Sequence, residues 1–282
     1  MSPPADAPPS PLLARTAGGD RTALWLPLLR RLTREVPGWV LWKNAESAFH
    51  GTGDIDAAAP EEDWPLVERI FCRWAAEAGA GPVVVCRHIP GGLNLVAVPP
   101  GGTHLLEMGV KCTRLWRGAP LFGHADLMAH ARMDPRGFRR VRPGAEGVYK
   151  LLLNGMRRGG APDWPALRDK DVPALLRADP VGARAAARRF GPFAPAAARL
   201  ARAVAGDGWD RPSAAALELW AALRALRSPG VALARLRFRR AGGKRCPVLA
   251  ALLAAHRRIP ADRDAWLRDV ARTHRVHGAG GG

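Results

Sequence analysis

The segment Gly51-Thr-Gly-Asp-Ile-Asp56 constrains the fold and the chemistry of this chain more than any other stretch. Polar and apolar residues alternate from Asp54 to Ala57, and two further alanines lead to Pro60. Proline cannot continue a hydrogen-bonded ladder, so we predict a short strand over 54–59. Asp54 and Asp56 then project to the same face of the strand. A divalent cation would relieve the repulsion between two such carboxylates. The alternative is that they are polar decoration at a strand edge.

The elements predicted on either side of this segment indicate an α+β fold. A helix is expected before it, over 22–36, followed by a short strand over 39–42. Apolar side chains at helical spacing predict a further helix over 61–78. Tight Gly/Pro turns then join three strands expected to form an antiparallel meander, at 82–88, 93–98 and 104–115. Beyond Gly118 we expect helices, apart from a short strand at 138–141.

The charge distribution divides the 282-residue chain into two parts. Its net charge is +18, and residues 161–282 carry 23 basic and 10 acidic side chains, against 20 and 15 in residues 1–160. Gly159, Gly160 and Pro162 mark a break in the helical pattern at the same place. We therefore predict four parts: a disordered Pro/Ala-rich tail (1–21), a mixed-sheet domain (22–160), an all-helical basic domain (161–275) and a flexible Gly-rich tail (276–282).

Several classes of protein are disfavoured by composition. No apolar run approaches the roughly 18 residues of a membrane-spanning helix, and the first 20 residues do not resemble a secretory signal. The four cysteines are scattered, without a C-x-x-C pair, which is typical of reduced thiols. We expect a cytoplasmic protein with no membrane partner. The positive charge is compatible with nucleic acid, but the excess of Arg over Lys also fits a compositional bias.

Short motifs in a fixed order resemble the nucleotidyltransferase superfamily, which has the polymerase-β-like fold. They are closest to a bacterial branch in which Trp/Leu-Lys/Arg-Asn ends the first strand and Gly-x-x-Asp-hydrophobic-Asp follows, as in Trp42-Lys-Asn44 and Gly51-Thr-Gly-Asp-Ile-Asp56 here. The stretches 115–121 and 143–152 resemble its Arg-Gly-x-x-Leu turn and its Pro-x-x-Glu helix. The resemblance covers about residues 22–160. It implies a small mixed sheet with flanking helices that binds a nucleoside triphosphate.

The resemblance also implies a set of metal ligands. Asp54 and Asp56 correspond to the aspartates that bind Mg²⁺ or Mn²⁺ with the triphosphate. A third carboxylate is expected on a later strand, and Glu107 is the only acid between residues 88 and 118. Glu107 is therefore implied to complete the metal site or to take the proton of the attacking hydroxyl.

Phosphate binding must differ from that of the catalytic members. They place Gly-Ser or Gly-Gly at the end of the first strand, where this chain has Trp42 and Lys43. An ammonium and an amide both suit phosphate oxygens, so we assign phosphate contacts to Lys43 and Asn44. The backbone amides of the glycine-rich turn can also approach an anion, which adds Gly51, Thr52 and Gly53 to the set.

Two functions follow as hypotheses. The first is a Mg²⁺-dependent nucleotidyltransferase that moves a nucleoside monophosphate from a triphosphate to an unidentified acceptor hydroxyl. The second is a catalytically inactive module of the same fold that binds nucleotide, or a polyanion such as nucleic acid, through its basic helical half. Arg235, Arg239 and Arg240 form a candidate anion patch there. They also fit a solvated final turn of a helix, where cations favour the helix dipole.

Overall fold

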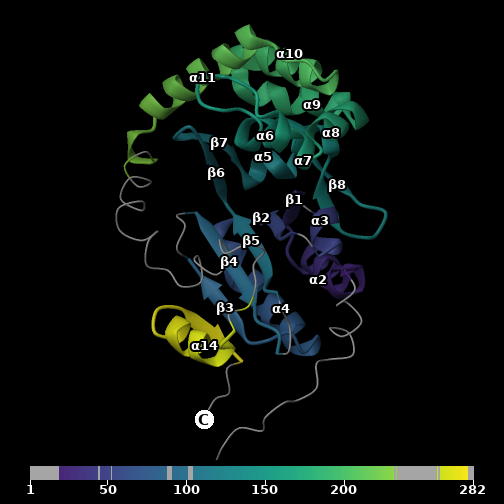
Figure 1. Cartoon of the computed structure of the whole chain (residues 1–282), viewed down its shortest axis with the longest axis vertical. Coiled ribbons are helices and arrows are strands. Elements are labelled where there is room, and N and C mark those ends of the chain that lie inside the picture. Colours follow the sequence, from purple (N-terminus) through teal and green to yellow (C-terminus); the bar gives the residue numbers. More distant parts are fainter. Residues whose placement is uncertain are drawn as a thin grey trace, which may run out of the picture. The chain divides into compact units, whose positions relative to one another are not determined.

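A computed structural model of the chain describes residues 19–43, 45–51, 53–87, 91–100, 104–231, 233, 259 and 261–278. The fold is α+β, as expected (Figure 1). Two compact units divide the chain, each built from separate segments. The first contains the described parts of Met1–Cys112, Asp134–Arg139 and Phe238–Gly282, and the second those of Thr113–Met133 and Arg140–Arg237. This division differs from the boundary expected near residue 160, because the chain passes between the units several times.

One mixed sheet of eight strands has the order β10-β3-β4-β5-β2-β1-β9-β8. Strand β2 runs parallel to β5, and antiparallel pairs join β1 to β2, β3 to β4, β4 to β5 and β10 to β3. The predicted antiparallel meander is therefore confirmed as β3-β4-β5, but its third strand ends at Lys111 and not at residue 115. The strands are β1 (Val40–Lys43), β2 (Ile55–Ala58), β3 (Val83–Cys86), β4 (Gly92–Ala97), β5 (Leu106–Lys111), β8 (Ala131–Met133), β9 (Arg139–Val141) and β10 (Arg275–His277).

Strand β10 departs from the sequence analysis, which placed its residues at the end of a helical domain and in a Gly-rich tail. Its three residues pair with β3, with Arg275 opposite Val85 and His277 opposite Val83. Three residues give too short a pattern for the period-2 alternation of a strand to be recognised. The pairing also joins segments far apart in sequence, which no local signal reports.

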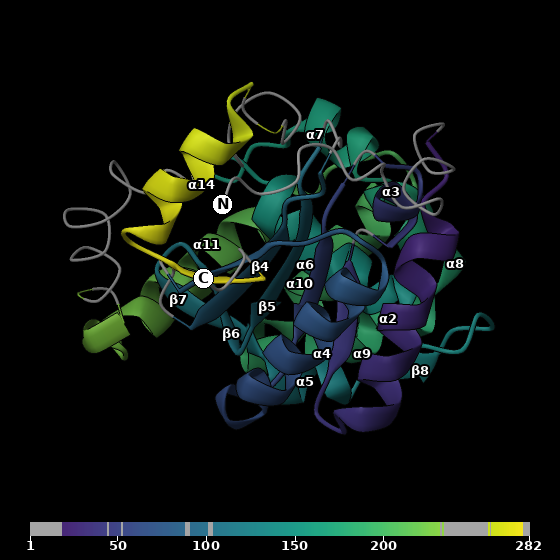
Figure 2. The same cartoon turned by 90° about the horizontal axis from the view of Figure 1, so that it is seen from below.

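Two helices, α2 (Thr22–Glu35) and α4 (Trp64–Glu77), lie side by side on one face of the sheet (Figure 2). Their apolar stripes enclose the main core, in which the rings of Trp25 and Trp74 stack with centroids 5.0 Å apart. The indole of Trp74 also donates a hydrogen bond to the carbonyl of Leu24 at 2.9 Å. We call this the core face of the sheet.

The opposite face is covered differently near strands β3 and β4. Helix α14 (Arg263–Ala271) lies across the sheet from α2 and α4 (Figure 2). Leu267 and Val270 of this helix pack against Val84, Cys86 and Val96 in a second, smaller core. A short apolar stripe is sufficient for this because it covers only the edge of the sheet.

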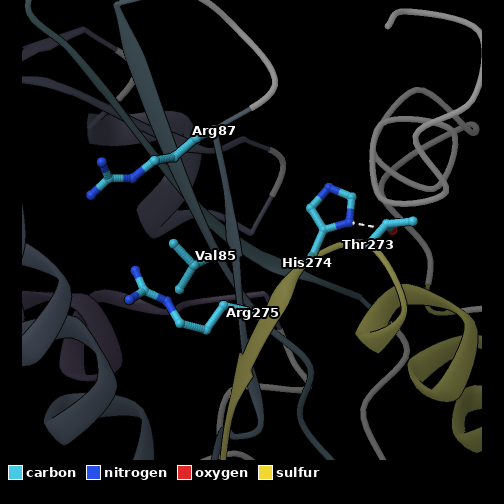
Figure 3. Close-up of a pocket in the computed structure, with 5 residues that line it drawn as sticks. All are labelled: Val85, Arg87, Thr273, His274 and Arg275. Atoms are coloured by element: carbon cyan, nitrogen blue, oxygen red, sulfur yellow. Dashed lines mark hydrogen bonds between the residues drawn. The ribbon is translucent and has the colours of Figure 1, made fainter.

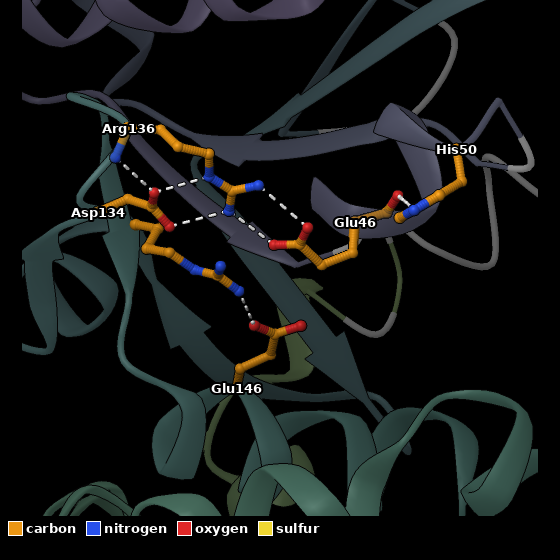
Figure 4. A network of polar contacts seen from close by, with 6 residues as sticks. Glu46, His50, Asp134, Arg136 and Glu146 are labelled. Carbon is orange, nitrogen blue, oxygen red and sulfur yellow. Dashed lines mark hydrogen bonds and ion pairs between the residues drawn. The ribbon is translucent and has the colours of Figure 1, made fainter. Parts of the chain in front are cut away.

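The segment Asp134–Arg139 is held to the first unit by a network around Arg136 (Figure 4). The Arg136 guanidinium donates to Asp134 at 2.8 Å and to both carboxylate oxygens of Glu46 at 2.7 and 3.0 Å. It also lies over the rings of Phe49 and Phe138. The hydrogen bonds to Asp134 and Glu46 raise the pKa of Arg136 above its usual range. Glu46 belongs to α3 (Ala45–Phe49). The network therefore has a structural role.

The second unit is mainly helical but contains a hairpin. Strands β6 (Thr113–Trp116) and β7 (Ala119–Gly123) meet at Arg117 and Gly118, both with positive φ, at 54° and 90°. Two such residues make the turn that suits a two-residue hairpin. Arg117 is held there by an ion pair to Glu218 at 3.0 Å. The expectation of helix directly after Gly118 was therefore wrong.

The remaining described helices of this unit are α5 (His124–Met128), α6 (Pro143–Asn154), α7 (Trp164–Asp169), α8 (Val172–Ala178), α9 (Pro180–Ala187), α10 (Ala194–Ala205) and α11 (Arg211–Leu226), with a 3-10 segment at Arg188–Phe193. Helix α6 packs against α8 and α9, and α10 against α11. Over the part of the chain that is described, no helix combines the length and apolar character needed to cross a bilayer.

Candidate active site on the polar face of the sheet

A line of facing residues crosses four strands of the first unit. Asp56 on β2 lies opposite Lys43 on β1 and opposite Gly109 on β5, and Gly109 in turn lies opposite Asn94 on β4. Glu107 is two residues from Gly109 on the same strand, so its side chain shares this face. Lys111, two residues further on, shares it as well.

We call Lys43, Asp56, Asn94, Glu107 and Lys111 the polar row. It occupies the face of the sheet opposite the core face, because the residues that alternate with it, such as Ile55 and Met108, belong to the main core. Four of its members are buried: Asp56, Asn94, Glu107 and Lys111 expose only 6–8% of their surface. Buried charge is costly unless it is paired or hydrogen-bonded, so the contacts within the row decide its stability.

Each acid of the polar row has a defined partner. The Lys43 ammonium lies 2.9 Å from a carboxylate oxygen of Asp56. The amide of Asn94 donates to Glu107 at 3.3 Å, and Asn94 accepts a hydrogen bond from Lys111 at 2.8 Å. The negative charge of each acid is therefore offset by a neighbour in the row, Lys43 for Asp56 and Asn94 for Glu107. Lys43, which the sequence analysis assigned to a phosphate, neutralises Asp56.

Gly109 keeps the centre of the row open. A Cβ atom at this position would lie 3.5 Å from the Asn94 side-chain oxygen and 3.6 Å from an Asp56 carboxylate oxygen. The side-chain oxygens of Asn94 and Asp56 therefore lie beside Gly109, which has no side chain of its own. Oxygen atoms of this kind are the ligands that Mg²⁺ prefers.

Asp54 and Glu107 are related by the same register. Ile55 lies opposite Met108 in the parallel pair, so the preceding residues, Asp54 and Glu107, are the next to face each other if the register continues. Asp54 is half-buried and directly precedes β2. Among the described residues, no group of three or more His, Cys, Asp or Glu side chains is gathered closely enough to hold a metal ion. The strands thus align the acids without closing a metal cage.

The local backbone structure explains why glycine occupies positions 51 and 53, before the aspartates. Gly51 follows α3 with φ of +74°, a conformation that side chains rarely adopt. A Cβ atom on Gly53 would lie 2.6 Å from the hydroxyl oxygen of Ser47. Both glycines are therefore required by the turn between α3 and β2, whether or not their amides meet an anion. Five predicted site residues lie outside the described residues: Asn44, Thr52, Arg235, Arg239 and Arg240.

The sequence analysis missed Asn94 and Lys111. A detectable signal was present, since Asn94 stands within the otherwise apolar stretch Gly92–Ala97 and Lys111 ends the buried run of β5. A polar residue inside a buried strand is more informative than an exposed one. With Lys43 and Lys111 near two acids, the row combines hard oxygen ligands with cations suited to phosphate. No family model, curated protein or solved structure gives a match to this chain.

Proposed function

We propose that the chain is a metal-dependent nucleotidyltransferase with a polymerase-β-like arrangement of its sheet. An acceptor hydroxyl would attack the α-phosphorus of a nucleoside triphosphate, forming a new P–O bond as the bond to pyrophosphate breaks. The hydroxyl proton passes to a carboxylate, and pyrophosphate leaves with the bonding electron pair. Such chemistry depends mostly on positioning and on neutralising phosphate charge.

The observation that carries the proposal is the register of β2 and β5. It sets Asp56 and Glu107 on the same face of neighbouring parallel strands, with Gly109 leaving room beside them. Asp54 precedes Asp56 by two residues and extends the same line. This is the arrangement that the Asp-x-Asp motif and a third strand acid imply. The register also supports Glu107 as the third acid, because a glutamate on the opposite face of β5 would lie too far from Asp56 to share a site with it.

The residues present fit a divalent metal by the chemistry of their donors. Asp54, Asp56 and Glu107 would hold Mg²⁺ or Mn²⁺, which when bound neutralises triphosphate charge. Lys43 would exchange its ion pair with Asp56 for contact with a phosphate oxygen. Glu107, buried and within reach of Asn94, would accept the proton of the acceptor hydroxyl.

A second candidate function is a module that binds nucleotide without transferring it. The pairing of Asp56 with Lys43 favours it, because a carboxylate that already has a cation at 2.9 Å is less available to a metal. The ammonium groups of Lys43 and Lys111 could also contact phosphate oxygens directly. The two functions therefore predict the same ligand and differ in the fate of the phosphate bond.

The test is transfer of label from α-³²P nucleoside triphosphates, supplied with Mg²⁺ or Mn²⁺, to any component of a cell extract. The full chain is compared with an Asp54→Asn/Asp56→Asn variant. A matched control, Glu62→Gln/Asp63→Asn, makes the same charge change on the 3-10 turn Glu61–Asp63, away from the polar face. We expect a labelled product with the wild type and the control, and none with the Asp54→Asn/Asp56→Asn variant.

Binding of each triphosphate by the purified chain, measured by calorimetry, separates the two candidates. Triphosphate binding without any labelled product would favour the binding module. A product formed equally by the wild type and the Asp54→Asn/Asp56→Asn variant would exclude these aspartates from catalysis. If neither transfer nor binding occurs, both candidates are wrong.

A further inference from the structure

A pocket of about 380 Å³ lies at the β10 edge of the first unit (Figure 3). It is lined by Val85, Arg87, Thr273, His274 and Arg275. Four of these five side chains carry a polar or charged group. None of them belongs to the polar row, so the pocket is a separate feature of the molecule.

The strand register brings its two arginines together. Arg275 lies opposite Val85 in the antiparallel pair, and Arg87 follows Val85 by two residues, so both arginines share one face. Figure 3 shows Arg87 and Arg275 extending to the same side, with Val85 between them. Val85 belongs to the main core, whereas Asn94 belongs to the opposite face. The two arginine side chains therefore extend on the core-face side of the sheet, whereas Thr273 and His274 line the pocket from the segment just before β10.

The charges around the pocket are only partly compensated. Arg275 donates to Glu68 on α4 at 2.7 Å, and Glu68 also meets His277 at 3.0 Å. Arg87 is exposed and lies over the ring of Trp64, with its guanidinium carbon 5.5 Å from the ring centroid. Within the described residues it forms no ion pair with a carboxylate. Two guanidinium groups, those of Arg87 and Arg275, therefore share the charge of one carboxylate, Glu68, among these residues.

Neutral hydrogen-bonding groups complete the lining. The Thr273 hydroxyl and the His274 ring nitrogen Nδ1 are 2.8 Å apart. Burial lowers the pKa of His274, which favours the neutral form of its imidazole. The lining of the pocket therefore includes two arginines, a hydroxyl and an imidazole.

We propose that this pocket binds a phosphate group carried by a small molecule. A guanidinium presents a planar fork of donors that matches phosphate oxygens. Arg87 forms no ion pair with a carboxylate among the described residues, and Arg275, whose Nη2 donates to Glu68, has further N–H donors. Glu68 is already bound by Arg275 and His277 through its two carboxylate oxygens. The ligand is inorganic phosphate or a phosphate monoester such as a nucleoside monophosphate.

The experiment is a calorimetric titration of the full chain with inorganic phosphate and, separately, with AMP. We expect Arg87→Gln to weaken binding of both probes about tenfold or more, as loss of a bidentate charged contact would. Arg73→Gln is the matched control, since Arg73 is an exposed arginine of α4 that does not line the pocket. It should change the affinity by less than about twofold, because exposed charges outside contact distance are screened.

The two probes distinguish the source of the phosphate. Equal affinities would indicate that the phosphate group alone is recognised, and tighter binding of AMP would indicate a nucleotide. The Asp54→Asn/Asp56→Asn variant should keep the binding that Arg87→Gln loses, so a failure of the proposed catalysis leaves this proposal testable. Three results would overturn it: no binding of either probe at millimolar concentration, equal weakening by Arg73→Gln, or displacement of AMP by an oligonucleotide without terminal phosphate.

Discussion

The two faces of the central sheet use the same strands for opposite purposes. On the core face, β2, β4 and β5 present aliphatic side chains that pack under α2 and α4. On the other face the same strands present Asp56, Asn94 and Glu107, which are equally buried but polar. A change of one position along a strand exchanges one environment for the other.

The core face contributes mainly to the stability of the fold, and the polar row is expected to contribute mainly to function. Burial of aliphatic groups contributes favourably at every position of the core face. The polar row at best breaks even, because desolvation of its charges offsets their mutual attraction. Natural sequences keep such groups where activity requires them rather than where folding does. The comparison therefore predicts large stability effects on one face, and large ligand effects with small stability effects on the other.

The largest effect is expected from Leu95→Ala on the core face. Leu95 is fully buried, and its truncation removes apolar contacts and leaves a cavity. We expect the free energy of unfolding to fall by about 3 kcal/mol, measured by urea denaturation followed by tryptophan fluorescence. Leu226→Ala is the control, since Leu226 is 77% exposed, and should change it by less than about 0.5 kcal/mol. A loss below about 1 kcal/mol for Leu95→Ala would contradict the assignment of this face as the core.

A smaller loss is expected from Lys43→Met. This change leaves Asp56 buried without its cation and should destabilise the chain by about 2 kcal/mol, below the value for a fully buried pair because both side chains are slightly exposed. Lys43→Met/Asp56→Leu should recover most of that loss, because apolar groups can replace the pair. If the double variant were less stable than Lys43→Met, the ion pair would be a net source of stability.

Glu107→Gln should leave stability within about 1 kcal/mol of the wild type, since glutamine retains an oxygen that can accept from Asn94. Its effect should appear in metal binding instead. We expect the affinity for Mn²⁺, measured by calorimetry, to fall about tenfold, because an amide oxygen is a weaker ligand for a hard cation. Unchanged Mn²⁺ affinity would remove Glu107 from the proposed metal site.

The smallest effect on stability is expected from Gly109→Ala. Its added methyl would make ordinary contacts at 3.5 and 3.6 Å and would reduce the entropy of the unfolded chain. We expect a change of about 0.5 kcal/mol or less in the free energy of unfolding. Triphosphate binding by calorimetry should weaken, since the methyl enters the space beside Asp56. Normal binding would show that this opening is not used by the ligand.

The sequence predicted the elements of the first unit well where the patterns were long. The helices before and after Asp56 and the antiparallel order of β3, β4 and β5 follow from helical periodicity and from Gly/Pro turns. The hairpin at Arg117 was missed because its turn uses a non-glycine residue with positive φ, which is stabilised by a distant glutamate. Local patterns do not report that kind of support.

The candidate site was predictable in part. Alternation predicted that Asp54 and Asp56 share one face. The family resemblance implied a third acid, for which Glu107 was the only candidate between residues 88 and 118. The partners of these acids were not predictable, because the pairing of Asp56 with Lys43 and of Glu107 with Asn94 depends on strand register across the sheet. The pocket at Arg87 and Arg275 was missed for the same reason, since it joins β3 to a strand near the other end of the chain.

The late position of β10 has a consequence for synthesis on the ribosome. The outer edge of β3 has no partner until residues 275–277 emerge, long after Val83–Cys86 have been made. At ordinary elongation rates this interval is on the order of ten seconds or more, which is ample time for the residues of the second unit to collapse first. During it, the apolar segment Val83-Val-Val-Cys86 presents an open backbone edge, the kind of surface to which another unfinished chain can pair.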